Sequence, residues 1–282
     1  MKIVECPRDA MQGLSAFIPT DTKIAYINQL LKVGFDTIDF GSFVSPKAIP
    51  QLKDTAEVLA GLDLSNTTSK LLAIVANVRG AEEAVKYEEI AYLGFPFSIS
   101  ETFQQRNTNK SITEALNTLN EIQELCVKHN KQLVAYISMG FGNPYLDAYD
   151  PQIVAQFTDI LASLGIKIIS LADTIGVSNP DSIKPLFTTL KSAHPSIEFG
   201  AHLHSNPNTA VEKIEAAYEA GCQRFDGAMK GFGGCPMAED DLVGNLATET
   251  MLSVFEKNGV LLHLDKEAFK ESLLMAGEVF PS

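Results

Sequence analysis

Three observations predict that this sequence folds as an α/β protein, a closed (β/α)8 TIM barrel. Eight short β-branched or apolar runs alternate along the chain with stretches whose apolar residues recur at helical spacing. No linker or low-complexity segment interrupts this alternation. The chain has 282 residues, close to the roughly 250 that such a barrel typically needs. An open, doubly wound parallel sheet is the alternative fold for the same alternation.

The predicted strands are the runs richest in β-branched and large apolar residues. In chain order they cover residues 2–6, 37–43, 70–77, 92–99, 132–139, 167–173, 198–205 and 224–230. Because each strand is followed by a helical pattern, the strands are expected to run parallel and to be surrounded by the helices.

The helical stretches carry recognisable ends. Ser111 and Glu114 have the spacing of a capping box, and Gly34 stands where the C-cap of the first long helix is expected. A proline is expected to open each of the helices after the fifth, sixth and seventh strands, at Pro151, Pro180 and Pro207. A last helical pattern, at residues 265–277, predicts a helix appended to the barrel. We therefore expect residues 1–282 to form one domain, including a C-terminal helical segment at 259–282.

Charge and composition narrow the class of protein. The formal net charge of −13 and the pI of about 4.8 disfavour nucleic acid or an anionic membrane as a partner. The four cysteines include no CxxC pair, so a reducing compartment is expected rather than a disulfide framework. The chain has no signal-peptide or transit-peptide pattern, and no apolar run approaches the roughly 20 residues of a membrane helix. A cytoplasmic enzyme or binding protein is the expectation.

Polar residues collect where the predicted strands end, which is the face on which barrel enzymes carry out chemistry. Six or seven of the eight strand ends contribute at least one such residue. In chain order they are Arg8, Asp9, Gln12, Asp39, Glu101, Gln105, Arg106, Asn107, Asn143, Tyr145, Asp173, His202, His204, Cys235 and Asn245.

Two histidines one residue apart suggest a metal site. His202 and His204 end the seventh strand, where residues i and i+2 project from the same face. Asp9 is a candidate third ligand, and Asn245 could add a carbonyl oxygen. Imidazole and carboxylate ligands with open positions suit a divalent cation that acts as a Lewis acid, Mg²⁺ or Mn²⁺ first, with Zn²⁺ and Co²⁺ as alternatives. The other interpretation is a strand end whose histidines meet solvent or a backbone carbonyl.

The cysteines differ in their surroundings. Cys235 lies between Gly234 and Pro236 in a glycine-rich loop, which favours a reactive thiol over a buried apolar residue. Cys6, Cys126 and Cys222 lie in strand or helix patterns, where a cysteine is usually a small buried residue.

Six segments resemble, in order along almost the whole chain, motifs of the 3-hydroxy-3-methylglutaryl-CoA (HMG-CoA) lyase family. They are ECPRDAMQG at 5–13, GSFVSPKAIPQL at 41–52, SISETFQQRNTNKSI at 98–112, SLADTIGVSNP at 170–180, GAHLHSN at 200–206 and GFGGCPMAEDDLVGNLATE at 231–249. The last run is highly specific. H-x-H and R-D also occur in the wider metal-dependent barrel superfamily, which includes isopropylmalate and homocitrate synthases.

The resemblance implies a metal-dependent carbon–carbon lyase that cleaves HMG-CoA to acetyl-CoA and acetoacetate. It implies metal ligation by Asp9, His202, His204 and Asn245, and removal of the substrate hydroxyl proton by Asp9 or His202. Arg8 would stabilise the enolate of the departing acetyl-CoA, and the Cys235 thiol would act in proton transfer. Gln12, Asp39 and Asp173 would line the substrate site. The family analogy also implies an acyl-CoA substrate and a homodimer formed through the last barrel helices and the C-terminal segment.

Several positions depart from the family pattern. Ala10 stands in place of a glycine, Ser15 in place of a lysine, Asp39 in place of a glutamate and Asn143 in place of a common cysteine. These departures leave open a related aldolase or acyl-CoA lyase with another substrate. A barrel that has lost activity and only binds is the third hypothesis, which the joint presence of Arg8 and the other site residues disfavours.

Overall fold

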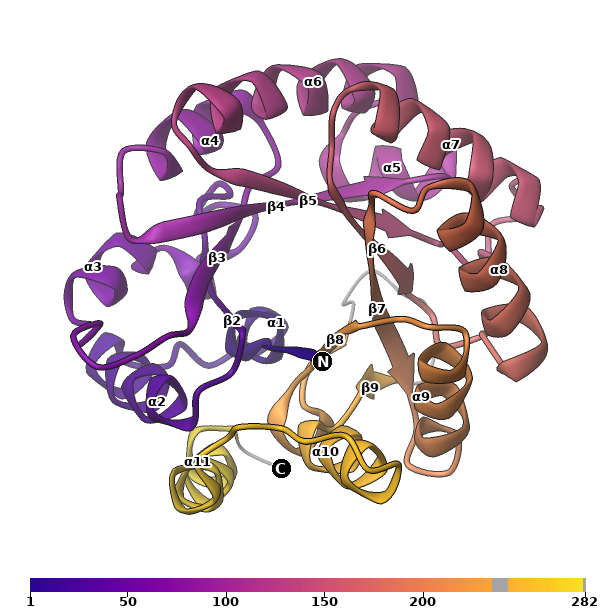
Figure 1. The fold of residues 1–282 in the computed structure, drawn as a ribbon. Coiled ribbons are helices and arrows are strands. Elements are labelled where there is room, and N and C mark those ends of the chain that lie inside the picture. The colour runs from indigo at the N-terminus through magenta and orange to yellow at the C-terminus, as the bar shows by residue number, and fades with distance from the viewer. Residues whose placement is uncertain (235–242, 281–282) are drawn as a thin grey trace.

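Eight parallel strands close into a barrel in the computed structural model, which describes residues 1–234 and 243–280 (Figure 1). The strands are β1 (Lys2–Glu5), β2 (Thr37–Ser42), β3 (Lys70–Ile74), β4 (Ile90–Ser98), β5 (Gln132–Ser138), β6 (Ile168–Asp173), β7 (Glu198–Ser205) and β8 (Arg224–Gly227). Each strand pairs with the next, and β8 pairs back with β1, with Lys2 opposite Arg224 and Glu5 opposite Gly227. The predicted closed barrel is confirmed, and the open sheet is excluded.

Helices surround the barrel in chain order, as Figure 1 shows. They are α1 (Pro7–Gln12), α2 (Thr20–Val33), α3 (Thr55–Ala60), α4 (Val78–Ala84), α5 (Glu101–Thr108), α6 (Ile112–Lys128), α7 (Pro151–Ser163), α8 (Pro180–Ala193), α9 (Ala210–Glu219), α10 (Thr248–Lys257) and α11 (Lys266–Val279), with single 3-10 turns η1 (Pro50–Leu52) and η2 (Met229–Gly231). The appended helix α11 packs beside α2 and completes the ring between α2 and α10. No helix in the described part of the chain is both long enough and apolar enough to cross a bilayer.

Most predicted helix ends are confirmed. The Ser111 hydroxyl accepts the Glu114 N–H, and the Glu114 carboxylate accepts the Ser111 N–H, so the capping box of α6 is complete. Gly34 ends α2 in the left-handed conformation with φ of 86°. The prediction for Pro207 is wrong, because α9 begins only at Ala210. The Asn206 side chain instead accepts the Asn208 N–H and closes a turn ahead of the helix.

Two strands end three residues earlier than predicted. β3 ends at Ile74 because Asn77 already caps α4, its side chain accepting the Gly80 N–H at 2.8 Å. β8 ends at Gly227 because the chain turns into η2 at Met229. Both early endings place loop residues at the carboxyl-terminal rim of the barrel.

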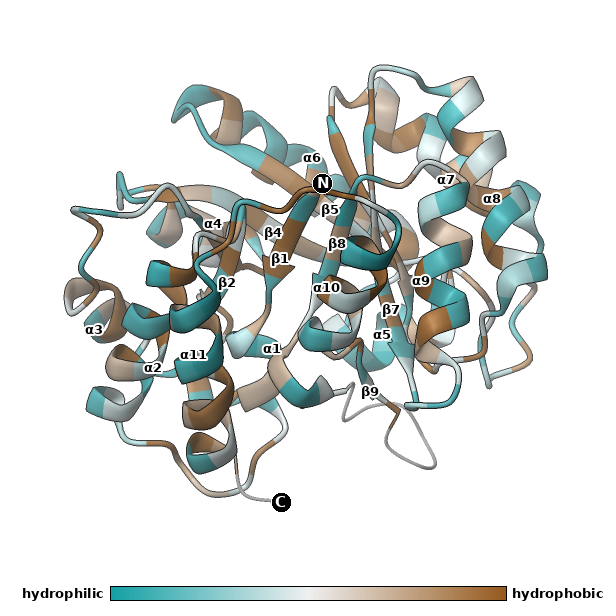
Figure 2. Cartoon of the chain, turned by 60° about the horizontal axis from the view of Figure 1, so that its bottom comes forward, coloured by the Kyte–Doolittle hydropathy of each residue, from teal (hydrophilic) through white to brown (hydrophobic). Residues whose placement is uncertain are grey.

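The core has two layers. Inside the barrel, a small cluster combines aliphatic residues with two tyrosines: Leu72, Ile74, Tyr92, Val134, Tyr136 and Ile168. A larger apolar layer lies between the strands and the helices. Figure 2 shows strands that are largely hydrophobic and helices that carry hydrophilic residues on part of their surface. Packing on both sides makes the strand ends a rigid support for a site.

One buried carboxyl joins the two ends of the chain. Glu5 accepts hydrogen bonds from the Thr248 hydroxyl at 2.6 Å and from the Met229 N–H at 2.8 Å. Burial raises the pKa of Glu5 from its usual 4.5 to about 8, although both hydrogen bonds oppose the rise. The folded protein therefore holds a proton on Glu5 that the unfolded chain releases above pH 4.5.

The Glu5 proton predicts a pH dependence of stability. Between pH 4.5 and about 8 the folded state binds the extra proton, so the free energy of unfolding should fall as pH rises. The slope from this one group is at most about 1.4 kcal/mol per pH unit. Glu5→Gln should flatten the curve and raise the melting temperature at pH 8 more than at pH 5, as measured by thermal unfolding at both pH values. An equal change at the two values would contradict the assignment.

Candidate active site

A cavity opens at the carboxyl-terminal ends of the strands, where the sequence predicts the site. Its walls come from seven of the eight strands or the segments that follow them: Arg8, Asp9, Gln12, Val44, Ala48, Ile49, Ile74, Ala76, Pro96, Phe103, Arg106, Asn107, Thr108, Tyr136, Ser138, Ala172, Thr174, His202 and His204. Its polar lining includes Arg8, Asp9 and both histidines. Val44, Ile49, Ile74 and Pro96 add an apolar wall. A ligand with one charged end and one hydrophobic part fits such walls.

Asp9, His202 and His204 converge on one point of this cavity. One ligand atom from each lies within 4.8 Å of the others. Asp9 is distant in sequence, but β1 pairs with β8 and β8 with β7, so barrel closure brings it beside the histidines. The strand ends thus assemble three of the residues that the sequence predicts as metal ligands.

The tautomer of His204 leaves one nitrogen available. Its Nδ1 lies 2.9 Å from the Thr174 carbonyl, which can only accept, so Nδ1 carries the proton. Nε2 is buried, and no described residue gives it a hydrogen-bond partner. Burial lowers the pKa of His204 to about 4, with the neighbouring His202 acting in the same direction. A neutral imidazole with a buried, unpartnered lone pair is suited to bind a metal ion.

His202 is oriented by a carboxylate that sequence reasoning missed. Asp226 Oδ2 lies 3.2 Å from His202 Nδ1, and the Asp226 side chain is fully buried. Burial lowers the pKa of His202, but Asp226 and Asp9 outweigh this effect, and the pKa rises. Asp226 is the one acidic residue of β8, but its contact with His202 depends on the pairing of β8 with β7, which no local pattern shows.

Arg8 links the polar groups of the cavity. Its Nη1 donates to Asp9 and to Gln12, each at 2.8 Å. The guanidinium also forms a bidentate ion pair with Asp39, through Nε at 3.0 Å and Nη2 at 2.5 Å. Burial lowers the pKa of Arg8, but the charges of Asp39 and Asp9 outweigh it, and the pKa rises. Burial raises the pKa of Asp39 to about 6 against the opposing effect of Arg8.

The Asp39 side chain therefore reaches Arg8 although the family pattern has a longer glutamate. It does not line the cavity and acts behind Arg8. Gln12 lines the cavity and also donates to Asp9 at 3.0 Å. Two further departures from the family pattern, Ser15 and Asn143, lie outside the cavity walls.

Asn245 contacts Asp9 from the segment that follows β8. A short strand, β9 (Gly244–Asn245), pairs antiparallel with β7 and sets Asn245 opposite His204. The Asn245 amide donates to Asp9 Oδ2 at 2.7 Å and to the Phe232 carbonyl at 2.9 Å. In this orientation Asn245 holds the Asp9 carboxylate through its nitrogen. Gly233 packs against both, since a Cβ there would lie 2.9 Å from the Asp9 carbonyl oxygen and 2.7 Å from Asn245 Nδ2.

Cys235, the predicted reactive thiol, lies outside the described residues.

Asp173 is not among the residues that line the cavity. Its carboxylate accepts the Lys213 ammonium at 2.9 Å and the N–H groups of Val177 and Ser178 at 2.9 and 3.0 Å. Lys213, which sequence reasoning missed, also donates to the His204 carbonyl at 2.8 Å. The pair is buried, with each side chain 1% exposed. It ties the end of β6 to the end of β7, beneath His204.

Removing the Lys213 charge should loosen His204. Lys213→Met leaves the buried Asp173 unpaired, which typically costs about 3–5 kcal/mol of stability. It should also weaken Mn²⁺ binding by roughly 10–100-fold, as loss of a group that positions a ligand does. Thermal unfolding and Mn²⁺ titration check both effects. The matched control is Lys184→Met, which removes the exposed pair with Glu219 and should change neither. Unchanged Mn²⁺ affinity in Lys213→Met would refute the positioning role.

Comparison with known proteins agrees with this geometry. The family model described as HMGL-like matches residues 2–273. The hydroxymethylglutaryl-CoA lyase YngG of Bacillus subtilis is 34% identical over 264 residues, covering 93% of this chain and 86% of that protein. The 3-hydroxy-3-isohexenylglutaryl-CoA/hydroxy-methylglutaryl-CoA lyase of Pseudomonas aeruginosa is 34% identical over 266 residues, covering 93% and 86%.

The chain is also similar to a solved structure of an HMG-CoA lyase. An HMG-CoA lyase from Acinetobacter baumannii, in complex with coenzyme A and 3-methylmalate, superposes with a TM-score of 0.91 at 31% identity. The superposition covers 99% of this chain and 91% of the other. The family model and the relatives extend over almost the whole barrel and over most of each relative's length. This chain belongs to the HMGL-like family.

Proposed function

We propose that this protein is a divalent-metal-dependent lyase that cleaves HMG-CoA to acetyl-CoA and acetoacetate. The observation that carries the proposal is the convergence of Asp9, His202 and His204 beside Arg8 at the mouth of the barrel. Relatives that are lyases of this substrate by name support it, and they align along most of their own length.

Asp9, His202 and His204 would hold the cation. The unpartnered Nε2 of His204 and the neutral state of that ring fit this role, and Mg²⁺ or Mn²⁺ suits a mixed carboxylate and imidazole set with open positions. When bound, such an ion polarises the hydroxyl and carboxylate oxygens of a substrate. Asn245 would join the ligands only with its amide oxygen turned toward the ion; otherwise it orients Asp9.

Arg8 would stabilise the negative charge that develops on the thioester oxygen. Its guanidinium is fixed by Asp39, Asp9 and Gln12, so it is already in place before the carbon–carbon bond breaks. Asp9 or His202 would take the proton of the tertiary hydroxyl, since both line the cavity beside the proposed cation. When the bond between C2 and C3 breaks, the C3 oxygen becomes the ketone of acetoacetate and the electron pair forms the enolate of acetyl-CoA. The Cys235 thiol would protonate C2 of this enolate.

The Cys235 role has a direct test. Cys235→Ala should lower turnover by at least about 10²-fold, the usual contribution of one proton transfer. Mn²⁺ affinity should stay unchanged, because the thiol is not one of the proposed ligands. The matched control is Cys126→Ala, which removes a buried thiol on the outer helix α6. A Cys235→Ala enzyme that turns over at the wild-type rate would refute the role of this thiol in proton transfer.

The substrate assignment is tested by product analysis. The protein is incubated with HMG-CoA and Mn²⁺, and the products are identified by mass spectrometry. We expect acetyl-CoA and acetoacetate in equal amounts. Release of free coenzyme A together with the intact six-carbon acid would indicate thioester hydrolysis and overturn the proposal.

A second candidate is cleavage of a related 3-hydroxyglutaryl-CoA with a longer alkyl group on C3. The apolar wall formed by Val44, Ile49, Ile74 and Pro96 favours it, and the name of the Pseudomonas relative includes an isohexenyl substrate. A higher kcat/KM for the isohexenyl than for the methyl substrate would establish this alternative.

We further propose that the protein is cytoplasmic and that two copies pair through the last helices and the C-terminal segment. Leu261 and Leu274 on this segment are 85% and 65% exposed, so pairing there would remove apolar surface from water. Light scattering on the purified protein measures the oligomeric state, and a monomeric mass would contradict the pairing.

A further inference from the structure

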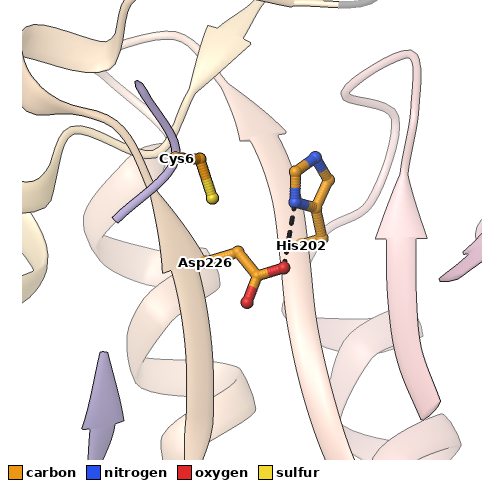
Figure 3. A group of neighbouring side chains, drawn as sticks. All are labelled: Cys6, His202 and Asp226. Atoms are coloured by element: carbon orange, nitrogen blue, oxygen red, sulfur yellow. Dashed lines mark hydrogen bonds and ion pairs between the residues drawn. The ribbon is translucent and has the colours of Figure 1, made fainter. Parts of the chain in front are cut away.

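A second group of metal-ligating atoms lies below the first, toward the barrel interior. Cys6, His202 and Asp226 each place one ligand atom within 4.8 Å of the other two. They come from three adjacent positions in the barrel wall, because Cys6 directly follows β1, Asp226 lies in β8 and His202 in β7. Figure 3 shows the Cys6 sulfur directed toward the space between the His202 ring and the Asp226 carboxylate.

The three side chains hold unused or weakly used donor atoms. Asp226 Oδ1 is buried, and no described residue gives it a hydrogen-bond partner. The Cys6 sulfur makes one long contact, 3.7 Å to the Val4 carbonyl. Such a buried, unpaired carboxylate oxygen is costly in a folded protein and calls for an explanation. A cation between these atoms would supply one.

The separation of the His202 and Asp226 donor atoms suits a tetrahedral ion. Zinc bonds to imidazole nitrogen and carboxylate oxygen of about 2.0–2.2 Å put the two ligand atoms about 3.3 Å apart. His202 Nδ1 and Asp226 Oδ2 are 3.2 Å apart, so an ion beside the line that joins them could bond to both atoms in place of the proton. A thiolate, an imidazole and a carboxylate form a ligand set that selects Zn²⁺ or a similar thiophilic ion over Mg²⁺.

We propose that Cys6, His202 and Asp226 form a second cation site, specific for thiophilic divalent ions such as Zn²⁺ and Cd²⁺. On binding, the Cys6 thiol gives its proton to solvent and the sulfur becomes a thiolate ligand. The proton on His202 Nδ1 moves to Nε2, and Nδ1 bonds to the ion. One proton is therefore released per ion when the Asp9–His202–His204 site is empty.

Cation binding at one site should weaken binding at the other, because both sites use the His202 imidazole. A proton on Nδ1, donated to Asp226, leaves the Nε2 lone pair of His202 free for the upper site. An ion on Nδ1 places the proton on Nε2 and removes that lone pair. A thiophilic ion should therefore weaken Mn²⁺ binding above it without contacting Asp9 or His204, and so inhibit the enzyme. Only this inhibition rests on the proposed function; the binding of the ion does not.

Binding is tested with Cd²⁺, whose thiolate complexes absorb in the ultraviolet. All proteins carry Cys235→Ala, so that the other candidate reactive thiol is absent. We expect a charge-transfer band that saturates at one Cd²⁺ per chain, is lost in Cys6→Ser and in Cys6→Ala, and persists in the control Cys126→Ser. No band in the parent, or a band that survives both Cys6 replacements, would overturn the proposal whether or not the protein cleaves HMG-CoA. Using two replacements guards against one that fails to fold.

The inhibition is tested separately on proteins with Cys235 intact. Cys6→Ser should keep the Mn²⁺-supported rate and raise the Cd²⁺ concentration for half inhibition by at least about 10-fold. Equal inhibition of Cys6→Ser and the parent would refute the coupling between the two sites.

Discussion

Replacing His204 with alanine should abolish measurable cleavage of HMG-CoA while leaving the barrel folded. The ring supplies the one buried Nε2 that no described residue partners, and the Thr174 carbonyl fixes its tautomer. Losing this ligand should release the cation. A bound cation of this kind lowers the free energy of the transition state by several kcal/mol. The rate should therefore fall by about 10³-fold or more.

Two measurements and one control variant separate this cause from unfolding. Mn²⁺ titration should show lost or greatly weakened binding, circular dichroism should show the wild-type helix content, and His263→Ala, which removes an exposed histidine, should match the wild type in both. A His204→Ala protein that binds Mn²⁺ at wild-type affinity would contradict the assignment of this residue as a ligand.

Replacing Arg8 with methionine should lower kcat by about 10³-fold at unchanged Mn²⁺ occupancy. The guanidinium is the buried cation of the cavity, and preorganised charge of this kind is the largest single contribution in many enzymes. Arg8→Lys should recover only part of the lost kcat. An ammonium group cannot form a bidentate contact with Asp39 and also donate to Asp9 and Gln12.

The Arg8 replacements leave Asp39 and Asp9 without their partner, so their folding must be measured as well. Breaking a buried pair typically costs about 3–5 kcal/mol. Arg79→Lys, on an exposed position of α4, is the matched control and should keep both rate and melting temperature. If Arg8→Met is folded, loaded with Mn²⁺ and within about 10-fold of the wild-type rate, Arg8 does not stabilise the transition state.

The barrel and the meeting of Asp9 with the two histidines could be predicted because they follow from local patterns and strand order. The alternation of strands and helices predicts closure, and closure brings Asp9 beside the two histidines of β7. Helix ends with a local chemical cause, such as the capping box at Ser111, were also predictable. The start of α9 was not, because the Asn206 side chain closes a turn first.

The supporting contacts could not be predicted because they depend on which side of a strand a residue faces and on what lies across it. Asp173 looked like a cavity residue at the end of β6, but its carboxylate pairs with Lys213 from α9. Asp226 and Cys6 looked like ordinary strand residues, yet β8 and β1 bring both to His202. Asn245 depends on the short strand β9, whose two residues carry no strand pattern of their own.

The most direct test of the account is the dependence of acetyl-CoA release on bound Mn²⁺. The protein is freed of metal with EDTA, and its rate with HMG-CoA is measured as Mn²⁺ is added back. We predict no turnover without metal and a rate that rises in proportion to the ion bound at Asp9, His202 and His204, reaching the range of roughly 1–10³ s⁻¹ typical of enzymes. Full turnover by the metal-free protein would contradict the central claim.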